Sequence, residues 1–223
     1  MNNKFIMDFL RDLSDNNNRE WFAANKERYA AAADFYKQEV TALIAKISEF
    51  DADIKNTKPE NCIFRIYRDI RFSPNKIPYK NHFGAYIAAN GGRKSIFGGY
   101  YLHFEPNNSF LSGGIYCPEK EILKKLRHGV EDNFDELQKI LNEKNFKKHF
   151  GDIHSYEKTS RLPLGFSKDS PAAKYLTFKH FVVEHHLVSE ETLFAENFID
   201  YAVEVFCSMK DFNRFFNEII SDK

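Results

Sequence analysis

Residues 81–118, NHFGAYIAANGGRKSIFGGYYLHFEPNNSFLSGGIYCP, decide the fold of this chain. Three stretches within them, 81–90, 96–106 and 108–118, are rich in aromatic and apolar side chains. The turn-forming sequences NGGRK and EPNNS separate these stretches. Strand-like stretches joined by such short turns pair with their chain neighbours in an antiparallel manner. The segment therefore predicts three strands of a β-meander.

Two more strands are expected, one on each side of this segment. CIFRIY at 62–67 alternates, with Cys62, Phe64 and Ile66 on one face, and KHFVVEHHLVS at 179–189 is similarly strand-like. The glycine pairs 98–99 and 113–114 fall inside predicted strands. Because glycine weakens a strand, each pair predicts a bulge or a close approach by another group.

Helical periodicity dominates both ends of the chain. Apolar residues from Phe5 to Leu13 predict a first short helix. Asn17 and Glu20 have the spacing of a capping box, which would start a long helix continuing to about Phe50.

The second half of the chain returns to helix twice. Residues 118–141 predict one helix, and Ser189 would cap a closing helix whose apolar stripe continues to Ile220. Helices on both sides of one run of strands indicate the α+β class. We expect an antiparallel sheet of about five strands, a meander, packed against the N-terminal and C-terminal helices.

Length and composition favour one domain over residues 1–223, with a shared core that 23 phenylalanines can fill. No run of about 18 apolar residues exists, so no membrane span is expected. Cys62, Cys117 and Cys207 are dispersed, which argues against a disulfide framework or a zinc cage. We therefore expect buried thiols in a cytoplasmic protein.

Residues 65–80, RIYRDIRFSPNKIPYK, form a basic segment in a chain that balances 32 basic with 32 acidic residues. Asp69 is the one acid among its five cations. The guanidinium group of arginine can donate two parallel hydrogen bonds to a phosphate or carboxylate, and lysine adds a compact positive charge. Tyr67 and Tyr79 could stack on a ring of the ligand. The basic side chains are Arg65, Arg68, Arg71, Lys76 and Lys80.

The basic segment predicts a binding site for an anionic small molecule bearing phosphate or carboxylate. If the site is catalytic, Asp69 and His103 are the candidates for a general base. The alternatives are a nucleic-acid contact, which the neutral net charge disfavours, and a non-catalytic module that docks an acidic partner protein. In a purely structural alternative, acids of the long helix such as Glu27 or Asp34 pair with the cations. The sequence identifies no cofactor, reaction or oligomeric state.

Histidines and glutamates on two predicted strands raise the question of a metal. Glu184 and His186 share one strand face, as do His103 and Glu105, and neighbouring strands would bring the four together. The spacing does not require this, and no H-E-x-x-H motif occurs. We therefore predict no metal site, and His185 is interpreted as a core histidine.

The basic segment also carries a family resemblance. RIYRDIRFSPNKIPYK resembles the signature of the family called domain of unknown function 2461, which reads approximately R-x-x-R-D-x-R-F, a short gap, Asp or Asn, Lys, two residues and Tyr. Residues 9–29 and 98–118 are similar as well, as are Arg127 and RLPLGF with its Arg161. Asn75 stands where the family often has Asp.

The resemblance implies one domain over almost the whole chain and no agreed activity, so no catalytic residue is carried over. Arg127 and Arg161 join the candidate site on the condition that their segments fold over the same basic surface. The candidate ligand-binding residues are Arg65, Tyr67, Arg68, Asp69, Arg71, Lys76, Tyr79, Lys80, Arg127 and Arg161.

Overall fold

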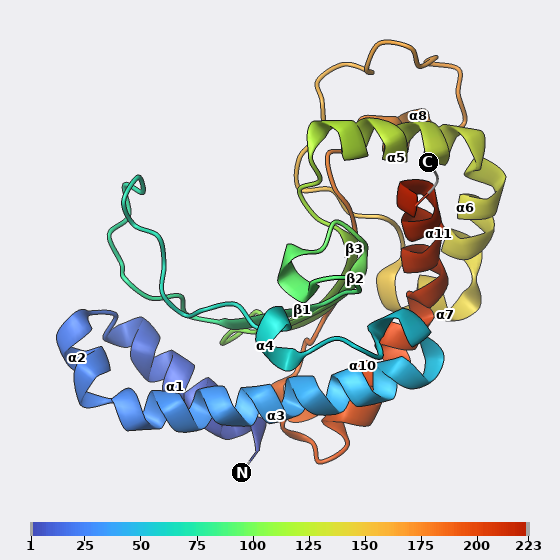
Figure 1. The fold of residues 1–223 in the computed structure, drawn as a ribbon. Helices are drawn as coiled ribbons and strands as arrows, with labels where there is room; N and C mark the ends of the chain where they lie inside the picture. Colours follow the sequence, from blue (N-terminus) through green and yellow to red (C-terminus); the bar gives the residue numbers. More distant parts are fainter. Residues whose placement is uncertain (1, 222–223) are drawn as a thin grey trace.

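A single antiparallel sheet lies at the centre of the computed structural model, which describes residues 2–221 (Figure 1). Within that range its order is β1-β2-β3-β4, so each strand pairs with its neighbour in sequence. This confirms the meander predicted from residues 81–118 and the strand predicted within 179–189. The strands are β1 (Phe83–Ile87), β2 (Gly99–Phe104), β3 (Phe110–Ile115) and β4 (Phe181–His186).

The predicted fifth strand at 62–67 is wrong. Its backbone touches β1 at one point only, where the Phe64 N–H donates to the Gly84 carbonyl oxygen at 2.9 Å. Further along, residues 66–68 turn away from β1 and pair with residues 78–80 of the same segment. The backbone groups that would have extended the sheet are therefore satisfied inside the basic segment.

Four helices precede the sheet, and their boundaries correct two expectations. Asn18, not Asn17, caps α2 by accepting from the Trp21 N–H at 2.9 Å. Asn25 then interrupts the predicted long helix. The helices are α1 (Asn3–Asp15), α2 (Arg19–Ala24), α3 (Lys26–Phe50) and α4 (Pro59–Cys62), and the 3-10 turns η1 (Ala52–Ile54) and η2 (Gly92–Lys94) lie before and after β1.

The later helices are also shorter than expected. The predicted helix over 118–141 breaks at Asn133, and the closing helix consists of three pieces. Ser189 caps the first of these by accepting from the Glu191 N–H, as predicted. The helices are α5 (Lys120–Asp132), α6 (Phe134–Asn142), α7 (Lys144–Phe150), α8 (Ala173–Leu176), α9 (Glu190–Phe194), α10 (Phe198–Ser208) and α11 (Lys210–Ser221).

The core lies between one face of the sheet and helices α3, α10 and α11. Tyr36 of α3 is fully buried, contacts the rings of Phe83 and Phe104, and donates its hydroxyl to the Leu102 carbonyl oxygen at 2.9 Å. A Cβ at Gly113 would lie 2.1 Å from the Met209 sulfur. The close approach predicted for the glycine pairs therefore brings the last helices onto the sheet.

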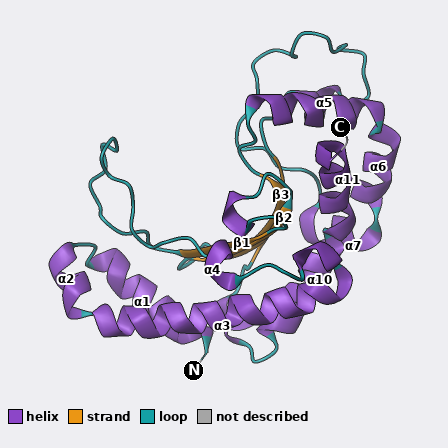
Figure 2. Ribbon diagram, viewed as in Figure 1, coloured by secondary structure: helices purple, strands orange, loops and turns teal. Residues whose placement is uncertain are grey.

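Two long loops leave this body in different directions. Figure 2 shows the basic segment and the connection between α7 and α8 as extended loops, well separated in this view. No helix in residues 2–221 has both the length and the apolar content needed to cross a bilayer.

The three cysteines are all unbridged, but they do not share one environment. Cys62 is buried, as expected, whereas Cys117 and Cys207 are exposed. The expectation of buried thiols is therefore wrong for two of the three.

Candidate functional site

The basic segment projects from the molecule as an arm (Figure 1), and aromatic side chains pack at its base. The Tyr79 ring stacks on Phe22 of α2, with centroids 3.9 Å apart and planes at 12°. Tyr67 packs at the edge of the same ring at 5.8 Å. Tyr79 is buried in this contact, so the two tyrosines anchor the base of the arm.

Beyond its base the arm satisfies several of its own charges. Arg71 forms a two-point ion pair with Asp69, at 3.0 and 2.7 Å, and these hydrogen bonds lower the pKa of Asp69. Arg68 donates to the Ile77 carbonyl oxygen at 3.2 Å, and Lys76 to that of Ile70 at 3.0 Å. Asp69 is therefore engaged by Arg71 and is poorly placed to act as a base.

An open cleft of about 700 Å³ lies where the arm joins the body. Arg65 and Lys80, from the two ends of the basic segment, both line it. The rest of the lining comes from α3, α4 and η2 and from the residues that follow α4, and we call the whole the basic cleft. Its lining residues are Tyr29, Ala33, Lys37, Glu60, Ile63, Phe64, Arg65, Lys80, Arg93 and Lys94.

Cations outnumber acids around the basic cleft by five to one. Glu60, the one acid, pairs with Lys37 at 2.6 Å. None of the other four cations forms an ion pair with a carboxylate of residues 2–221. The cleft therefore keeps an excess of positive charge, carried by Arg65, Lys80, Arg93 and Lys94.

Local contacts hold two of these cations, Arg93 and Lys80, in place. Arg93 donates from Nη1 to the carbonyl oxygens of Glu60 and Ile63, at 2.6 and 3.0 Å. Burial and the charge of Arg65 lower the pKa of Lys80, whose ammonium lies 5.4 Å from the centre of the Phe64 ring. The Arg65–Lys80 repulsion is the kind that a bound anion would relieve.

Arg127 and Arg161 lie away from the basic cleft. Arg127, on α5, is only 8 % exposed and donates from Nη2 to the Phe178 carbonyl oxygen at 2.8 Å. Arg161 belongs to the loop between α7 and α8, which Figure 1 shows beside α5 and far from the arm. The condition set for including these two residues is therefore not met.

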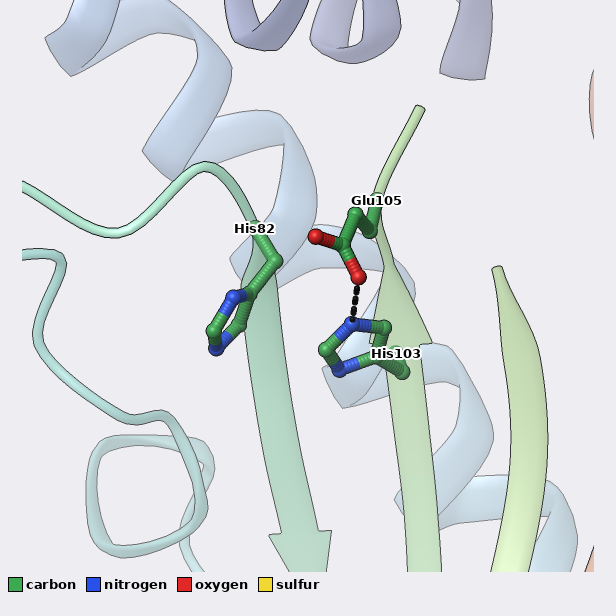
Figure 3. A group of neighbouring side chains, drawn as sticks. All are labelled: His82, His103 and Glu105. Atoms are coloured by element: carbon green, nitrogen blue, oxygen red, sulfur yellow. Dashed lines mark hydrogen bonds and ion pairs between the residues drawn. The ribbon is translucent and has the colours of Figure 1, made fainter. Parts of the chain in front are cut away.

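A second polar cluster stands beside the cleft, at one end of β1 and β2. His82 comes just before β1, His103 lies on β2 and Glu105 follows β2 (Figure 3). Their ligand atoms all lie within 4.8 Å of one another, and His103 Nε2 is 3.1 Å from Glu105 Oε2. His103 is thus engaged by a carboxylate and is only 6 % exposed, which weakens its candidacy as an isolated general base.

The environment lowers the pKa of both imidazoles of this cluster. Burial, followed by the neighbouring His103 and Lys80, lowers the pKa of His82 to about 4. Burial likewise lowers the pKa of His103, although Glu105 opposes that shift. Burial alone would raise the pKa of Glu105, but hydrogen bonds from Asn108 and His103 lower it.

The four-residue cluster considered from the sequence does not form. β3 separates β2 from β4, so His103 and His186 lie in one row with Phe110 between them. The Phe110 ring stacks on His103 at 4.5 Å and meets His186 at 5.4 Å. His185 is only partly buried, against Tyr201 and the His149 carbonyl oxygen, so it is not a fully enclosed core histidine.

Sequence reasoning missed His82 and the two cations of η2. His82 was readable in principle, because the Gly84–His103 pairing places position 82 opposite position 105. Arg93 and Lys94 were quoted only as part of a turn, and their approach to Arg65 depends on how that turn packs against α4.

Comparison with known proteins gives one result. Residues 5–215 match the model of a family described as conserved hypothetical protein (DUF2461), the family that the sequence resembles. No curated protein and no solved structure matches the chain.

Proposed function

We propose a binding function for this chain, which belongs to the DUF2461 family of conserved hypothetical proteins: its basic cleft holds an anionic small molecule that also has an apolar or aromatic part. The observation that carries the proposal is the set of four cations around one cleft that have no carboxylate partner among residues 2–221. Cations fixed side by side repel one another, and an anion that contacts several of them at once offsets that cost.

The size and the walls of the cleft support a ligand larger than a simple ion. A volume of about 700 Å³ falls within the range of small-molecule sites, roughly 300–1,000 Å³. Tyr29, Ile63 and Phe64 add apolar and aromatic surface to a lining that also carries the cations. A phosphate or carboxylate attached to a ring would use both kinds of surface.

The proposal narrows the site predicted from sequence. Of the ten candidate residues, Arg65 and Lys80 line the cleft and keep a direct role. Tyr67 and Tyr79 support the base of the arm, and the pairing of Asp69 with Arg71 removes both from the list of direct contacts.

Calorimetric titration of the purified chain with inorganic phosphate, ADP and benzoate tests the proposal. We expect ADP to bind more tightly than phosphate, because ADP, unlike phosphate, carries a ring as well as charged groups. Arg65→Ala and Lys80→Met should each weaken that binding by about tenfold to a hundredfold, the range for losing a hydrogen bond to a charged group.

Arg68→Ala is the matched control, because Arg68 belongs to the same segment but does not line the cleft. Its affinity for ADP should equal that of the unmodified chain. Equal losses for Arg65→Ala and Arg68→Ala would contradict the cleft as the site. The proposal would also be contradicted if every anion tested bound with a Kd weaker than millimolar.

A second candidate function rests on the tip of the arm. Phe72 is 93 % exposed there, with the Arg71 guanidinium 5.9 Å from its ring centre, and Lys76 is also exposed. Exposed rings beside cations suit stacking on single-stranded nucleic acid. A mobility-shift assay with an oligonucleotide at two salt concentrations separates this function from the first. Phe72→Ala should weaken oligonucleotide binding and leave ADP binding unchanged.

A further inference from the structure

The cluster of His82, His103 and Glu105 has no role in the basic cleft. Within residues 2–221 it is the one group of three or more histidine, cysteine and acidic side chains placed to hold a metal ion. Figure 3 shows the three side chains converging from the start of β1 and from β2. We propose that they bind a divalent transition-metal ion, with zinc as the best match.

The distances are close to those that zinc requires. With bonds of about 2.0–2.2 Å, a tetrahedral ion spaces its ligand atoms by roughly 3.4 Å. His103 Nε2 and Glu105 Oε2 are already 3.1 Å apart, and no pair of ligand atoms in the cluster exceeds 4.8 Å. A small side-chain rotation of His82 would complete the set without moving the strands.

The donor chemistry selects the class of metal. Two imidazoles and one carboxylate form a common three-ligand set for zinc, and they leave a fourth position for water. Magnesium and calcium prefer oxygen ligands alone, so this set disfavours them.

Neighbouring side chains already orient the proposed ligands. The Tyr101 hydroxyl lies 2.9 Å from His103 Nδ1, where it can accept the ring proton and leave Nε2 for the metal. Asn81 donates to Glu105 Oε1 at 2.7 Å and fixes the carboxylate plane. Asn108 donates to Oε2 at 2.7 Å.

Gly84 is part of the same arrangement. A Cβ at this position would lie 2.6 Å from the Tyr101 hydroxyl oxygen, so only glycine lets the hydroxyl occupy its place over β1. The Tyr101 hydroxyl, in turn, hydrogen-bonds His103 Nδ1 and holds the ring in its orientation. Gly84 therefore supports His103 through Tyr101, and the pairing of β1 with β2 does not by itself require a glycine for this.

The test is a titration of the chelator-treated full chain with Zn²⁺, and with Mg²⁺ as the comparison. We expect one zinc per chain, a Kd in the micromolar range or below, and no detectable magnesium binding. His82→Ala and Glu105→Gln should each weaken zinc binding at least tenfold. Tyr101→Phe should weaken it tenfold or more, because the ligand stays but loses its orientation.

His186→Ala is the matched control. His186 is an exposed histidine at the end of β4, beside a glutamate at 3.4 Å, and it lies outside the cluster. The control should bind zinc as the unmodified chain does. Equal zinc affinity in His82→Ala and the unmodified chain, or no binding at a ratio of one to one, would overturn the proposal.

A measurement on the unmodified chain guards against variants that fail to fold. X-ray absorption of the zinc-loaded protein should show two imidazole ligands and light oxygen or nitrogen donors at about 2.0–2.1 Å. A spectrum without imidazole scattering would rule the site out.

Discussion

Asn17 holds Tyr79 through both polar atoms of its side-chain amide. Its Nδ2 donates to the Tyr79 carbonyl oxygen and its Oδ1 accepts from the Tyr79 N–H, each at 3.1 Å. These two hydrogen bonds have the pattern of those between paired β-strands, and they connect the turn between α1 and α2 to the base of the basic segment. Lys80, the next residue, lines the basic cleft, so this tie helps to position one of its cations.

Replacing Asn17 should loosen the arm. Asn17→Ala removes two hydrogen bonds, each worth about 1 kcal/mol, so we expect the free energy of unfolding to fall by about 2 kcal/mol. Amide exchange at Tyr79 and Lys80 should become faster while exchange in β2 and β3 stays slow. Urea unfolding and hydrogen exchange measure the two effects.

Asn16→Ala is the control for that prediction. Asn16 is the neighbouring residue, and within residues 2–221 its exposed side chain donates only to the Asp12 carbonyl oxygen of its own helix. Its replacement should change the stability by less than about 0.5 kcal/mol. Similar losses for Asn16→Ala and Asn17→Ala would mean that the contact with Tyr79 contributes little.

Gly113→Ala should be strongly destabilising. The added Cβ would lie 2.1 Å from the Met209 sulfur and 2.7 Å from the Gly99 carbonyl oxygen. Overpacking of this kind costs about 1–3 kcal/mol or more, which thermal or urea unfolding will detect. Because removing the sulfur leaves the carbonyl contact, Gly113→Ala should still destabilise a Met209→Ala background, although by less than it destabilises the unmodified chain. No loss in that background would show that the backbone contact is unimportant.

The three thiols should differ in reactivity. Burial raises the pKa of the Cys62 thiol to about 12, and its side chain is enclosed, whereas Cys117 and Cys207 are exposed. Thiolate is the reactive form, so a thiol reagent at pH 8 should modify two cysteines rapidly in the native chain. The third should react only after denaturant is added. Three fast thiols in native buffer would contradict the burial of Cys62.

The outcome for the strands shows what sequence can determine. Residues 81–118 were predictable because each strand has its partner next to it in sequence, with turn residues between. Residues 62–67 had equally good alternation, but two partners were available: β1 and the end of the basic segment. An alternating pattern does not show which of two possible segments a strand-like stretch will pair with. In the structure, residues 66–68 pair with residues 78–80.

The same limit applies to the candidate site. Arg65 and Lys80 were found because a local imbalance of charge is visible in sixteen residues. Arg93 and Lys94 reach the same cleft from a distant turn, and only the packing of η2 against α4 brings them there. Asn17 was interpreted as a helix cap because its partner, Tyr79, is 62 residues away.

A partly buried carboxylate on α3 offers a test that is independent of the site. Glu39 accepts from Asn3 Nδ2 at 3.3 Å, and burial raises the pKa of Glu39 although that bond opposes the shift. The other amide atom, Asn3 Oδ1, is buried and has no hydrogen-bond partner among residues 2–221. A glutamine at position 39 could keep the first bond and donate its own N–H to Asn3 Oδ1.

Glu39→Gln should therefore stabilise the chain, and more at neutral than at acid pH. A carboxyl group with a raised folded-state pKa contributes fully below its unfolded value of 4.5 and loses that contribution as the pH rises through the folded value. Glutamine has no such loss, so its advantage should grow between pH 4 and pH 7, to about 1 kcal/mol with the added hydrogen bond. Urea unfolding at both pH values measures it, with Glu49→Gln on the exposed side of α3 as a control expected to change little. An advantage equal at both pH values would show that burial of the Glu39 charge costs nothing.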